Sequence, residues 1–529
     1  MDTDVAIIGA GAAGGILALE LARRGLAVVV LEAGPRWDLA RRGESVRRFL
    51  RREDPWPASL PGLDRYTVGG PVPYQLAGRR ARGVGGSTLA WEGYALRMHP
   101  DDFRMRSVYG IAQDWPLAYG DLEAYYGAAE AALGVAGATD DPWASARSTS
   151  FPLPAFAFSY SDGLFARAGQ SLGISLQHLP QARNSIAYGS RSQCRACGTC
   201  QACPTGAKAS VDLTHVPRAE ATGRVRVLTE TAALRLEVDA SGEVGSIVYA
   251  ARDKVEQRLT ARVYVLAGGA VENARLLLLS ASREFPSGVA NRSGLVGKYF
   301  MSHPSIDVVG RARENVYPYR IGFSTAMSRR FAVERARATR GALLLEFLNS
   351  AGPTPERIAL ASGLWGDALR RRVREEFGHW LGIRVYAEQL PAAVNAVSLN
   401  PRVTDYFGSA APHIHYSVGQ YERRALDEAK DICRRILGAA GVTDIQVTGM
   451  SFAGHQMGTH RMGTDPARSV VDANLRAHDV PNLYLVGAGS FVTAGASPPT
   501  LTIAALAVRA SEHIAGRLRP SASAVDQRA

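Results

Sequence analysis

The chain has 529 residues, of which 46% are hydrophobic and 21% are charged, with 54 Gly and 27 Pro. This composition excludes a mostly disordered or low-complexity protein, and the length predicts two domains or one large interleaved unit. The formal net charge is +12, and four of the 61 basic residues are Lys, which leaves 57 Arg spread along the chain. We interpret the densest Arg runs, at 41–52 and 370–374, as solvated helix faces, with an anionic partner or lipid surface as the alternative; the charge alone predicts no nucleic-acid partner.

The first 32 residues predict a strand, a turn, a helix and a second strand. Apolar residues at 5–8 and 27–31 indicate two short buried strands, and the apolar spacing of 16–26 indicates a helix between them. The motif GxGxxG occupies the first turn, and the acid Glu32 ends the second strand. This order is typical of a dinucleotide-binding unit.

Each position of this unit has a chemical role. Gly9 allows the tight turn, Gly11 lets the backbone approach a pyrophosphate, and Gly14 lets helix and strand pack closely. The amino end of the helix offers free amide donors to the diphosphate. The carboxylate of Glu32 suits a ribose diol and disfavours NADP, but the motif does not separate NAD from FAD. The cofactor contacts predicted here are Gly9, Gly11, Ala12, Gly14, Glu32 and Ala33.

Four of the five cysteines lie within ten residues, in three successive CxxC steps: Cys194, Cys197, Cys200 and Cys203. Thiolates so closely spaced on one loop are typical of an iron–sulfur cluster, although the last spacing is two residues where the ferredoxin run has three. Zinc is a second interpretation, which the short spacing disfavours, and free or disulfide-bonded thiols are a third.

The sequence shows no signal peptide, no run of about 18 apolar residues and no disulfide framework. We therefore expect a cytoplasmic protein without a transmembrane segment. Export by a partner subunit that carries a signal for both chains stays open.

Five segments, taken in order, resemble the glucose–methanol–choline (GMC) family of FAD-dependent oxidoreductases. They are RGVGGSTLAWEGYALRMHPDDF (82–103), AGGAVENARLLLLS (267–280), GKYFMSHP (297–304), GHQMGTHRMG (454–463) and NLYLVGAGSFVTAGASPPTLTIAALAVRASEHI (482–514). The resemblance spans residue 4 to about 515 and is nearest to the bacterial gluconate, sorbitol, fructose and glucose dehydrogenase flavoproteins. It implies an α/β fold in which a Rossmann-like FAD-binding domain is interleaved with an α+β substrate domain.

The resemblance also implies how the chain is divided. The FAD-binding domain would comprise 1–104, 206–302 and 450–518, and the substrate-binding domain 105–205 and 303–449. The polar tail at 519–529 is expected to be disordered.

Further FAD contacts follow from the same resemblance. A second glycine turn would press against the flavin and its diphosphate, and a third would meet the pyrophosphate and ribitol. The helix that follows would point its positive amino end at the reduced flavin. These contacts are Gly85, Gly86, Ser87, Gly489, Ser490 and Thr500. Some members attach the flavin to a histidine where this chain has Ala90, so we expect FAD to be bound non-covalently.

His455, in GHQMGT, matches the histidine that lies over the flavin in this family. A neutral imidazole suits a base that takes a hydroxyl proton while the carbinol hydrogen leaves as hydride. The family's second His or Asn is replaced by Pro498, which has no side-chain donor or acceptor. Either Ser497 or another residue takes that role, or one histidine orients the substrate, or the chemistry is altered. We interpret His303 as packing at the edge of the flavin domain and His460 as a structural hydrogen-bonding residue.

The resemblance therefore implies an FAD-dependent dehydrogenase that oxidises an alcohol or sugar hydroxyl and passes electrons through an iron–sulfur cluster. The expected partners are the small-molecule substrate and an electron-transfer protein or small partner subunit. Two alternatives stay open: an alcohol oxidase that reduces oxygen, with merely structural cysteines, and a flavin-binding enzyme with lyase or non-redox chemistry.

Overall fold

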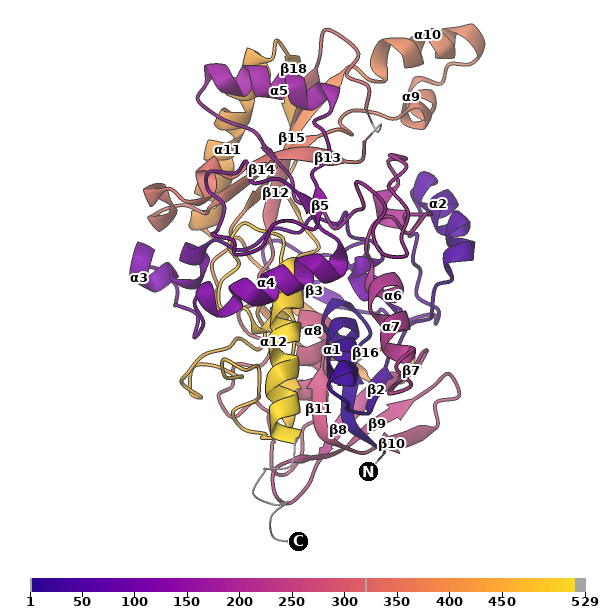
Figure 1. Cartoon of the computed structure of the whole chain (residues 1–529), viewed down its shortest axis with the longest axis vertical. Coiled ribbons are helices and arrows are strands. Elements are labelled where there is room, and N and C mark those ends of the chain that lie inside the picture. The colour runs from indigo at the N-terminus through magenta and orange to yellow at the C-terminus, as the bar shows by residue number, and fades with distance from the viewer. Residues whose placement is uncertain (1, 319–320, 519–529) are drawn as a thin grey trace.

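A computed structural model describes residues 2–318 and 321–518, so the tail expected to be disordered lies outside the described residues. The molecule is elongated, and Figure 1 shows two parts stacked along its longest axis. We call them the lower and upper part, as they lie in that view.

The lower part is built on a five-stranded parallel sheet in the order β20–β11–β1–β2–β7. Its strands are β1 (Thr3–Ile8), β2 (Val28–Leu31), β7 (Val225–Leu228), β11 (Ala261–Leu266) and β20 (Leu483–Leu485). They are almost continuously apolar, as strands covered on both faces must be. Around them lie α1 (Ala12–Arg23), α6 (Val211–Thr214), α7 (Val216–Glu220), α8 (Gly269–Leu279) and α12 (Thr500–Leu518), and α1 packs directly on α12 and α7. The Rossmann-like α/β class is thereby confirmed.

Two small sheets flank α8. One is antiparallel, with β8 (Ala232–Val238), β9 (Val244–Ala250) and β10 (Glu256–Leu259). The other joins β16 (Ala396–Thr404), β17 (Ala410–His415) and β3 (Thr67–Gly69). Because α8 contacts β8, β16 and β17, it is enclosed on several sides, which fixes the position of its amino end.

The upper part contains an antiparallel sheet in the order β18–β12–β15–β14–β13–β6, with β19 also paired to β12. Its strands are β6 (Gln177–His178), β12 (Pro304–Arg311), β13 (Ser324–Ser328), β14 (Leu343–Leu348), β15 (Trp380–Ala387), β18 (Thr443–Val447) and β19 (Ser451–Phe452). Helix α11 (Gln420–Ala439) packs against β12 and β15, and α5 (Tyr160–Ser171) packs against α11. The apolar side chains between sheet and helices form a second core.

Two segments that the sequence analysis assigned to the substrate domain contribute to the lower core. Helix α4 (Gly120–Leu133) packs on α12, and β16 and β17 pack on α8. Their apolar residues, among them Tyr126 and Ile414, belong to the same buried cluster as the parallel sheet. Amphipathic elements bury one face in either core equally well, so the sequence pattern does not reveal which core receives them.

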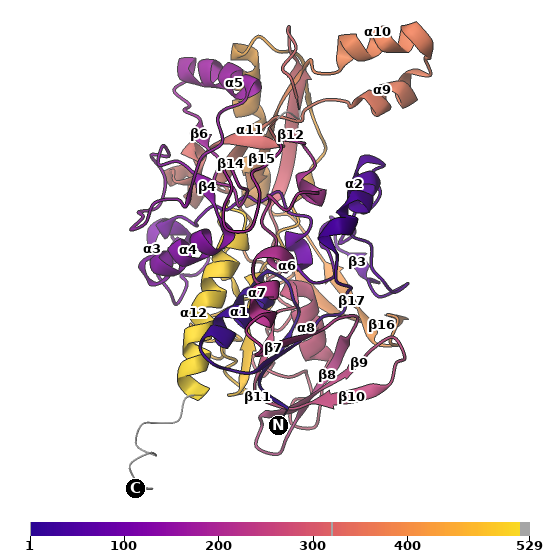
Figure 2. The same cartoon turned by 45° about the vertical axis from the view of Figure 1, so that its right-hand side comes forward.

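Between β14 and β15 the chain leaves the body as an arm of two helices, α9 (Pro355–Ser362) and α10 (Gly366–Glu376) (Figures 1 and 2). Helix α10 buries no residue, and Trp365 between the helices is 85% exposed. Shorter helices and strands complete the fold: α2 (Arg42–Leu50), α3 (Met105–Tyr109), β4 (Ala136–Gly137) and β5 (Leu153–Pro154). None of the helices in the described ranges is long and apolar enough to cross a membrane.

Candidate active site

A cavity of about 620 Å³ lies where the two parts meet. Its floor contains the carboxyl ends of the parallel strands, with Ile8, Leu31 and Ala267, and its opposite wall contains Ser305 and Tyr386 from the upper sheet. Ligands of open α/β sheets bind at the carboxyl ends of the strands, and a volume of several hundred Å³ suits a small-molecule site.

Backbone amides converge on the carboxylate of Glu32 at one end of the cavity. Oε2 accepts from the amide of Ala10 at 2.8 Å, and Oε1 accepts from those of Gly34 at 2.9 Å and Gly83 at 3.1 Å. The carboxylate thus joins the first and second glycine turns and lines the cavity. Helix α1 begins nearby at Ala12, and its N-cap residue Gly11 supplies no side-chain cap; the first turn has no acidic residue, which leaves its amide donors for a ligand.

The glycine turns touch each other and leave no room for side chains. A Cβ on Gly14 would lie 1.9 Å from the carbonyl oxygen of Gly9, so helix and strand pack at a distance that only glycine allows. Gly86 has a φ of +51°, and a Cβ there would lie 2.8 Å from the Cα of Gly11. The backbone itself therefore forms this wall of the cavity.

A buried ion network stands at the amino end of α8. Glu272 Oε1 accepts from Arg80 Nη1 at 2.8 Å and from Arg82 Nη2 at 2.9 Å, and both arginines also pair with Asp64. Burial alone raises the pKa of Glu272, but Arg82 and Arg80 hold it well below its usual value. Three members of this network, Arg80, Arg82 and Glu272, line the cavity, and the lowered pKa keeps Glu272 ionised near pH 7.

Two histidines meet at the other end of the cavity. His455 lines it, and its Nδ1 lies 2.8 Å from Nδ1 of His303, whose Nε2 lies 2.9 Å from the carbonyl oxygen of Gly495. Burial lowers the pKa of His303 to about 4, and desolvation together with His303 lowers that of His455 well below its usual value. Both rings are therefore neutral near pH 7.

Polar side chains of the upper sheet face this histidine pair. Tyr386 lies 5.7 Å from His455 between ring centroids, and Arg384 is held by a bidentate pair with Asp307 at 2.8 and 2.9 Å. The polar residues of the wall are Ser305, Arg384, Tyr386 and Ser451 from the upper sheet, together with Glu92 and Tyr94 from the segment after the second glycine turn. A ligand between His455 and this wall meets several donors and acceptors.

Family models match most of the chain: FAD binding domain at 2–45, and GMC oxidoreductase at 70–305 and 391–507. The fructose dehydrogenase large subunit of Gluconobacter japonicus is 32% identical, covering 98% of this chain and 99% of its own length. The 2-methyl-1,2-propanediol dehydrogenase of Mycolicibacterium austroafricanum is 30% identical, covering 99% and 97%. The chain belongs to the GMC oxidoreductase family.

This GMC oxidoreductase also shares its fold with solved structures. Pyridoxine 4-oxidase from Mesorbium loti superposes with a TM-score of 0.67 at 18% identity, over 96% of this chain and 98% of that one. The family resemblance predicted from the sequence is confirmed. The protein is an FAD-dependent oxidoreductase acting on CH–OH groups, and its glycine walls, uncapped helix and Glu32 carboxylate fit FAD.

Many of the predicted contacts lie together in the GMC oxidoreductase. Those that line the cavity are Gly9, Gly11, Ala12, Glu32, Ala33, Gly86, Ser87, His455 and Thr500. The residues outside its lining are Gly14, Gly85, Gly489, Ser490 and Ser497, of which the first is the packing glycine described above.

Three of these outer residues hold backbone in place. Gly489 lies directly against the ring of the fully buried His460, and the hydroxyl of Ser490 donates to the carbonyl of Gly487 at 2.8 Å. The hydroxyl of Ser497 donates to the carbonyl of Arg97 at 3.4 Å. Pro498 lines the cavity, as its place in the sequence motif predicts.

The cysteine run forms a loop with its thiols unevenly buried. Cys200 and Cys203 are buried, Cys194 is partly exposed and Cys197 is exposed. Arg183 Nη1 lies 3.7 Å from Sγ of Cys194 and 3.9 Å from Sγ of Cys200. In the part of the chain that the structure describes, no three His, Cys, Asp or Glu side chains are grouped to hold a metal ion. This arrangement gives no support to the predicted iron–sulfur cluster.

Sequence reasoning missed several lining residues and the partner of His455. His303 stands in a motif that was recognised, but nothing in GKYFMSHP shows that it meets a residue 152 positions later. Arg80 and Arg82 precede the second glycine turn, and nothing in the sequence except their charge indicated that they line the cavity. Tyr386 opens the segment YAEQLPAAVNAVSL, and its strand alternation with Arg384 could have indicated that both face the cavity.

Proposed function

We propose that this protein is a dehydrogenase that oxidises an alcohol or sugar hydroxyl by hydride transfer, with His455 as the base. The observation that carries the proposal is the position of His455 in one cavity between the cofactor-binding glycine walls and a polar wall of the upper sheet. The lower part would hold the cofactor, and the upper sheet would cover it and bind the substrate.

The dinucleotide would lie along the glycine turns, with its diphosphate at the amino end of α1 and a ribose at Glu32. When bound, FAD supplies the acceptor for the hydride. Thr500 at the start of α12 would place the positive end of that helix near the flavin. Because alanine at position 90 offers no nucleophile, we propose that FAD is held non-covalently, to be tested by its release on acid precipitation.

His455 would remove the hydroxyl proton. The O–H bond breaks with its proton going to the imidazole, the C–H bond breaks with its electron pair leaving as hydride, and a C=O bond forms. A neutral ring is required, and the lowered pKa of His455 keeps it neutral throughout the physiological range. The polar wall would hold the substrate's other hydroxyls so that the reacting carbon stays in place.

The polarity of the cavity supports a polyhydroxylated substrate over an apolar alcohol. Oε2 of Glu92 is buried with no hydrogen-bond partner among the described residues, so an apolar ligand that expelled water would leave this carboxylate oxygen unpaired. Fructose and 2-methyl-1,2-propanediol, which the names of two relatives contain, are both small and polar.

For the electron acceptor, we propose an iron–sulfur cluster on the cysteine loop, supported by the three CxxC steps and not by the arrangement of the thiols. Arg183 is buried, and it has no carboxylate partner among the described residues; Nε and Nη2 have no hydrogen-bond partner either. Such a charge would balance thiolate ligands. Stoichiometric iron and acid-labile sulfide in protein purified without oxygen would support the cluster, and an iron-free protein would refute it.

The base is tested by replacing His455 with Ala and mixing the FAD-loaded protein anaerobically with polyols and sugars. We expect flavin bleaching to slow by about 10²- to 10⁴-fold while FAD stays bound. His513→Ala is the matched control, because His513 lies on α12 outside the cavity and bonds Tyr484. Bleaching at the wild-type rate in the His455 variant contradicts the assignment.

Two measurements on the wild-type protein, peroxide formation in air and anaerobic flavin bleaching, separate the two alternatives. Fast peroxide formation in air by an iron-free protein would favour an oxygen-reducing oxidase. If no member of a broad alcohol and sugar panel bleaches the wild-type flavin, lyase or non-redox chemistry is favoured, as the missing partner at Pro498 first suggested.

A further inference from the structure

The two ring nitrogens of His303 have different partners, and this determines where its proton sits. Nε2 lies 2.9 Å from the carbonyl oxygen of Gly495, and because a carbonyl only accepts, Nε2 carries the hydrogen. The ring is fully buried and neutral near pH 7, so it holds one proton and Nδ1 is an acceptor.

The state of His455 follows from that of His303. Its Nδ1 lies 2.8 Å from the acceptor Nδ1 of His303, so it must be the donor of that hydrogen bond. A neutral ring has one hydrogen, and Nε2 of His455 is therefore left with a lone pair. Among the described residues this atom has no hydrogen-bond partner, and the side chain lines the cavity.

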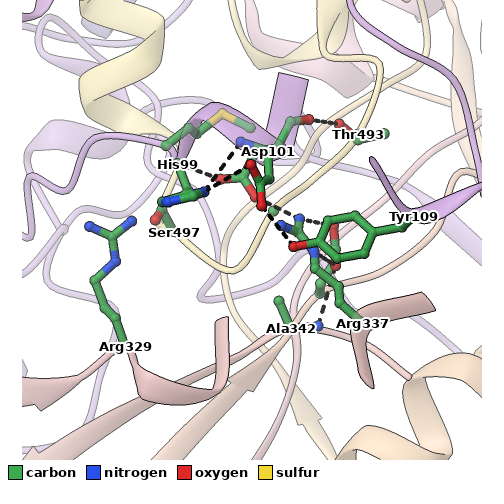
Figure 3. A network of polar contacts seen from close by, with 12 residues as sticks. His99, Asp101, Tyr109, Arg329, Arg337, Ala342, Thr493 and Ser497 are labelled. Carbon is green, nitrogen blue, oxygen red and sulfur yellow. Dashed lines mark hydrogen bonds and ion pairs between the residues drawn. The ribbon is translucent and has the colours of Figure 1, made fainter. Parts of the chain in front are cut away.

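The carbonyl of Gly495, where this chain of hydrogen bonds begins, lies in a backbone segment that is held at both ends. Thr493 donates to the carbonyl of Asp102 at 2.7 Å (Figure 3). Ser497 donates to the carbonyl of Arg97 at 3.4 Å. Gly495 lies between them with a φ of +59°, and a Cβ there would lie 2.9 Å from the Asp102 carboxylate carbon. The carbonyl of Gly495 therefore cannot rotate away from His303 without breaking these contacts.

The carboxylate beside Gly495 is fixed and neutralised. Oδ2 of Asp102 accepts from the amide of His99 at 2.7 Å, and Oδ1 accepts from Nη2 of the buried Arg337 at 2.5 Å. Arg337 also binds both oxygens of Glu388, at 2.8 and 2.6 Å. Asp102 and Glu388 are the acidic groups that favour a charged His303, and their pairing with Arg337 leaves burial as the larger influence on its pKa.

We infer that His303 is the positioning residue of the site: it fixes His455 in the tautomer whose Nε2 takes the substrate proton. The role that Pro498 leaves empty is thus supplied from the segment before β12, and Ser497 contributes as a clamp on backbone rather than as a partner of the substrate. This inference rests on the proposed function of His455, and it adds the reason why a single histidine suffices.

The test compares three replacements of His303 that keep different atoms. His303→Asn keeps an acceptor at the place of Nδ1, His303→Gln keeps a donor at the place of Nε2, and His303→Phe keeps only the ring. If His303 sets the tautomer, the rate of anaerobic flavin bleaching at saturating substrate falls by about 10- to 100-fold in the Gln and Phe variants and much less in Asn.

If His303 only anchors the carbonyl of Gly495, the bleaching rates follow the opposite order, with the Gln variant nearest to wild type. That result overturns the inference. His513→Phe serves as the matched control. FAD content and melting temperature are measured for every variant, and if the Phe protein fails to fold, the order of Asn and Gln still decides. Loss of bleaching in His455→Ala together with equal, wild-type rates in all three His303 variants refutes the positioning role alone, whereas wild-type bleaching in His455→Ala refutes the proposed base.

Discussion

At the scale of single residues, the site depends on atoms that are absent as much as on those present. One wall of the cavity is backbone because Gly14 and Gly86 have no side chain, and Pro498 has no side-chain donor, whereas His303 lies within hydrogen-bond distance of His455. At these positions neighbouring atoms are in direct contact, so we expect the addition or removal of a single side-chain group to disturb cofactor binding or catalysis.

Gly14→Ala is expected to abolish cofactor binding. The new Cβ would meet the carbonyl oxygen of Gly9 at 1.9 Å, which forces α1 away from β1 and opens the diphosphate site. FAD content after purification and the melting temperature measure the effect. Gly516→Ala is the matched control, because a Cβ there meets nothing within 4 Å and alanine favours a helix interior by about 1 kcal/mol. Retention of FAD by the Gly14 variant would show that α1 can shift without cost.

At the scale of elements, the arm formed by α9 and α10 contrasts with the enclosed helix α8. Helix α8 packs against strands of two sheets, whereas the arm buries little more than Ile358 and joins two strands that pair along the whole of β14. We expect the arm to contribute almost nothing to the stability of the body.

Replacing 355–376 by a short Gly-Ser linker should therefore leave FAD content unchanged and the melting temperature within a few degrees of wild type. The surface pair between Arg52 and Glu356, 3.7 Å apart, is lost, and such pairs contribute about 0–1 kcal/mol. Removing α2 is the contrasting control, because its Arg42 is buried and paired with Asp212. A large loss of stability on removing the arm would mean that it supports β14 and β15.

At the scale of the whole molecule, buried histidines should govern stability in mild acid. Burial lowers the pKa of His215 and His460 to about 3 and that of His303 to about 4, against 6.5 in the unfolded chain. Their contribution is present above pH 6.5 and is lost as the pH falls from 6.5 toward 4, because the unfolded state then binds more protons.

The unfolding free energy should fall by up to about 1.4 kcal/mol per pH unit for each histidine in this window. Melting temperatures at saturating FAD between pH 7.5 and 4.8 measure it, above the range in which most carboxylates titrate. His215→Phe, away from the cavity, should flatten the slope by about a quarter, because burial also lowers the pKa of His455. A melting temperature that does not change across this range contradicts the expectation.

The order of elements along the sequence predicted much of the fold. The apolar runs at 5–8 and 27–31 lie in adjacent strands of the parallel sheet, and the helix expected after the third glycine turn begins at Thr500. These features are local, because alternation, glycine spacing and helix periodicity are properties of short segments.

The meeting of distant residues could not be predicted in the same way. The contact of His303 with His455 and that of Arg82 with Glu272 join segments about 150 and 190 residues apart, and no local pattern specifies such a pair. The sequence likewise did not show that α4 and β16 pack on the lower core, because an apolar face can be buried against more than one neighbour.

The parallel sheet and its helices combine residues from both ends of the described sequence, from β1 to α12. Strand β1 lies at its centre, but the edge strand β20 and the covering helix α12 follow some 475 residues later along the chain. At a synthesis rate of about 5–20 residues per second, the apolar surface of β1 and α1 waits roughly 25 to 95 s on the ribosome before its final neighbours exist. We therefore expect cofactor uptake only at the end of synthesis, and until then the exposed apolar surface makes the nascent chain prone to aggregation.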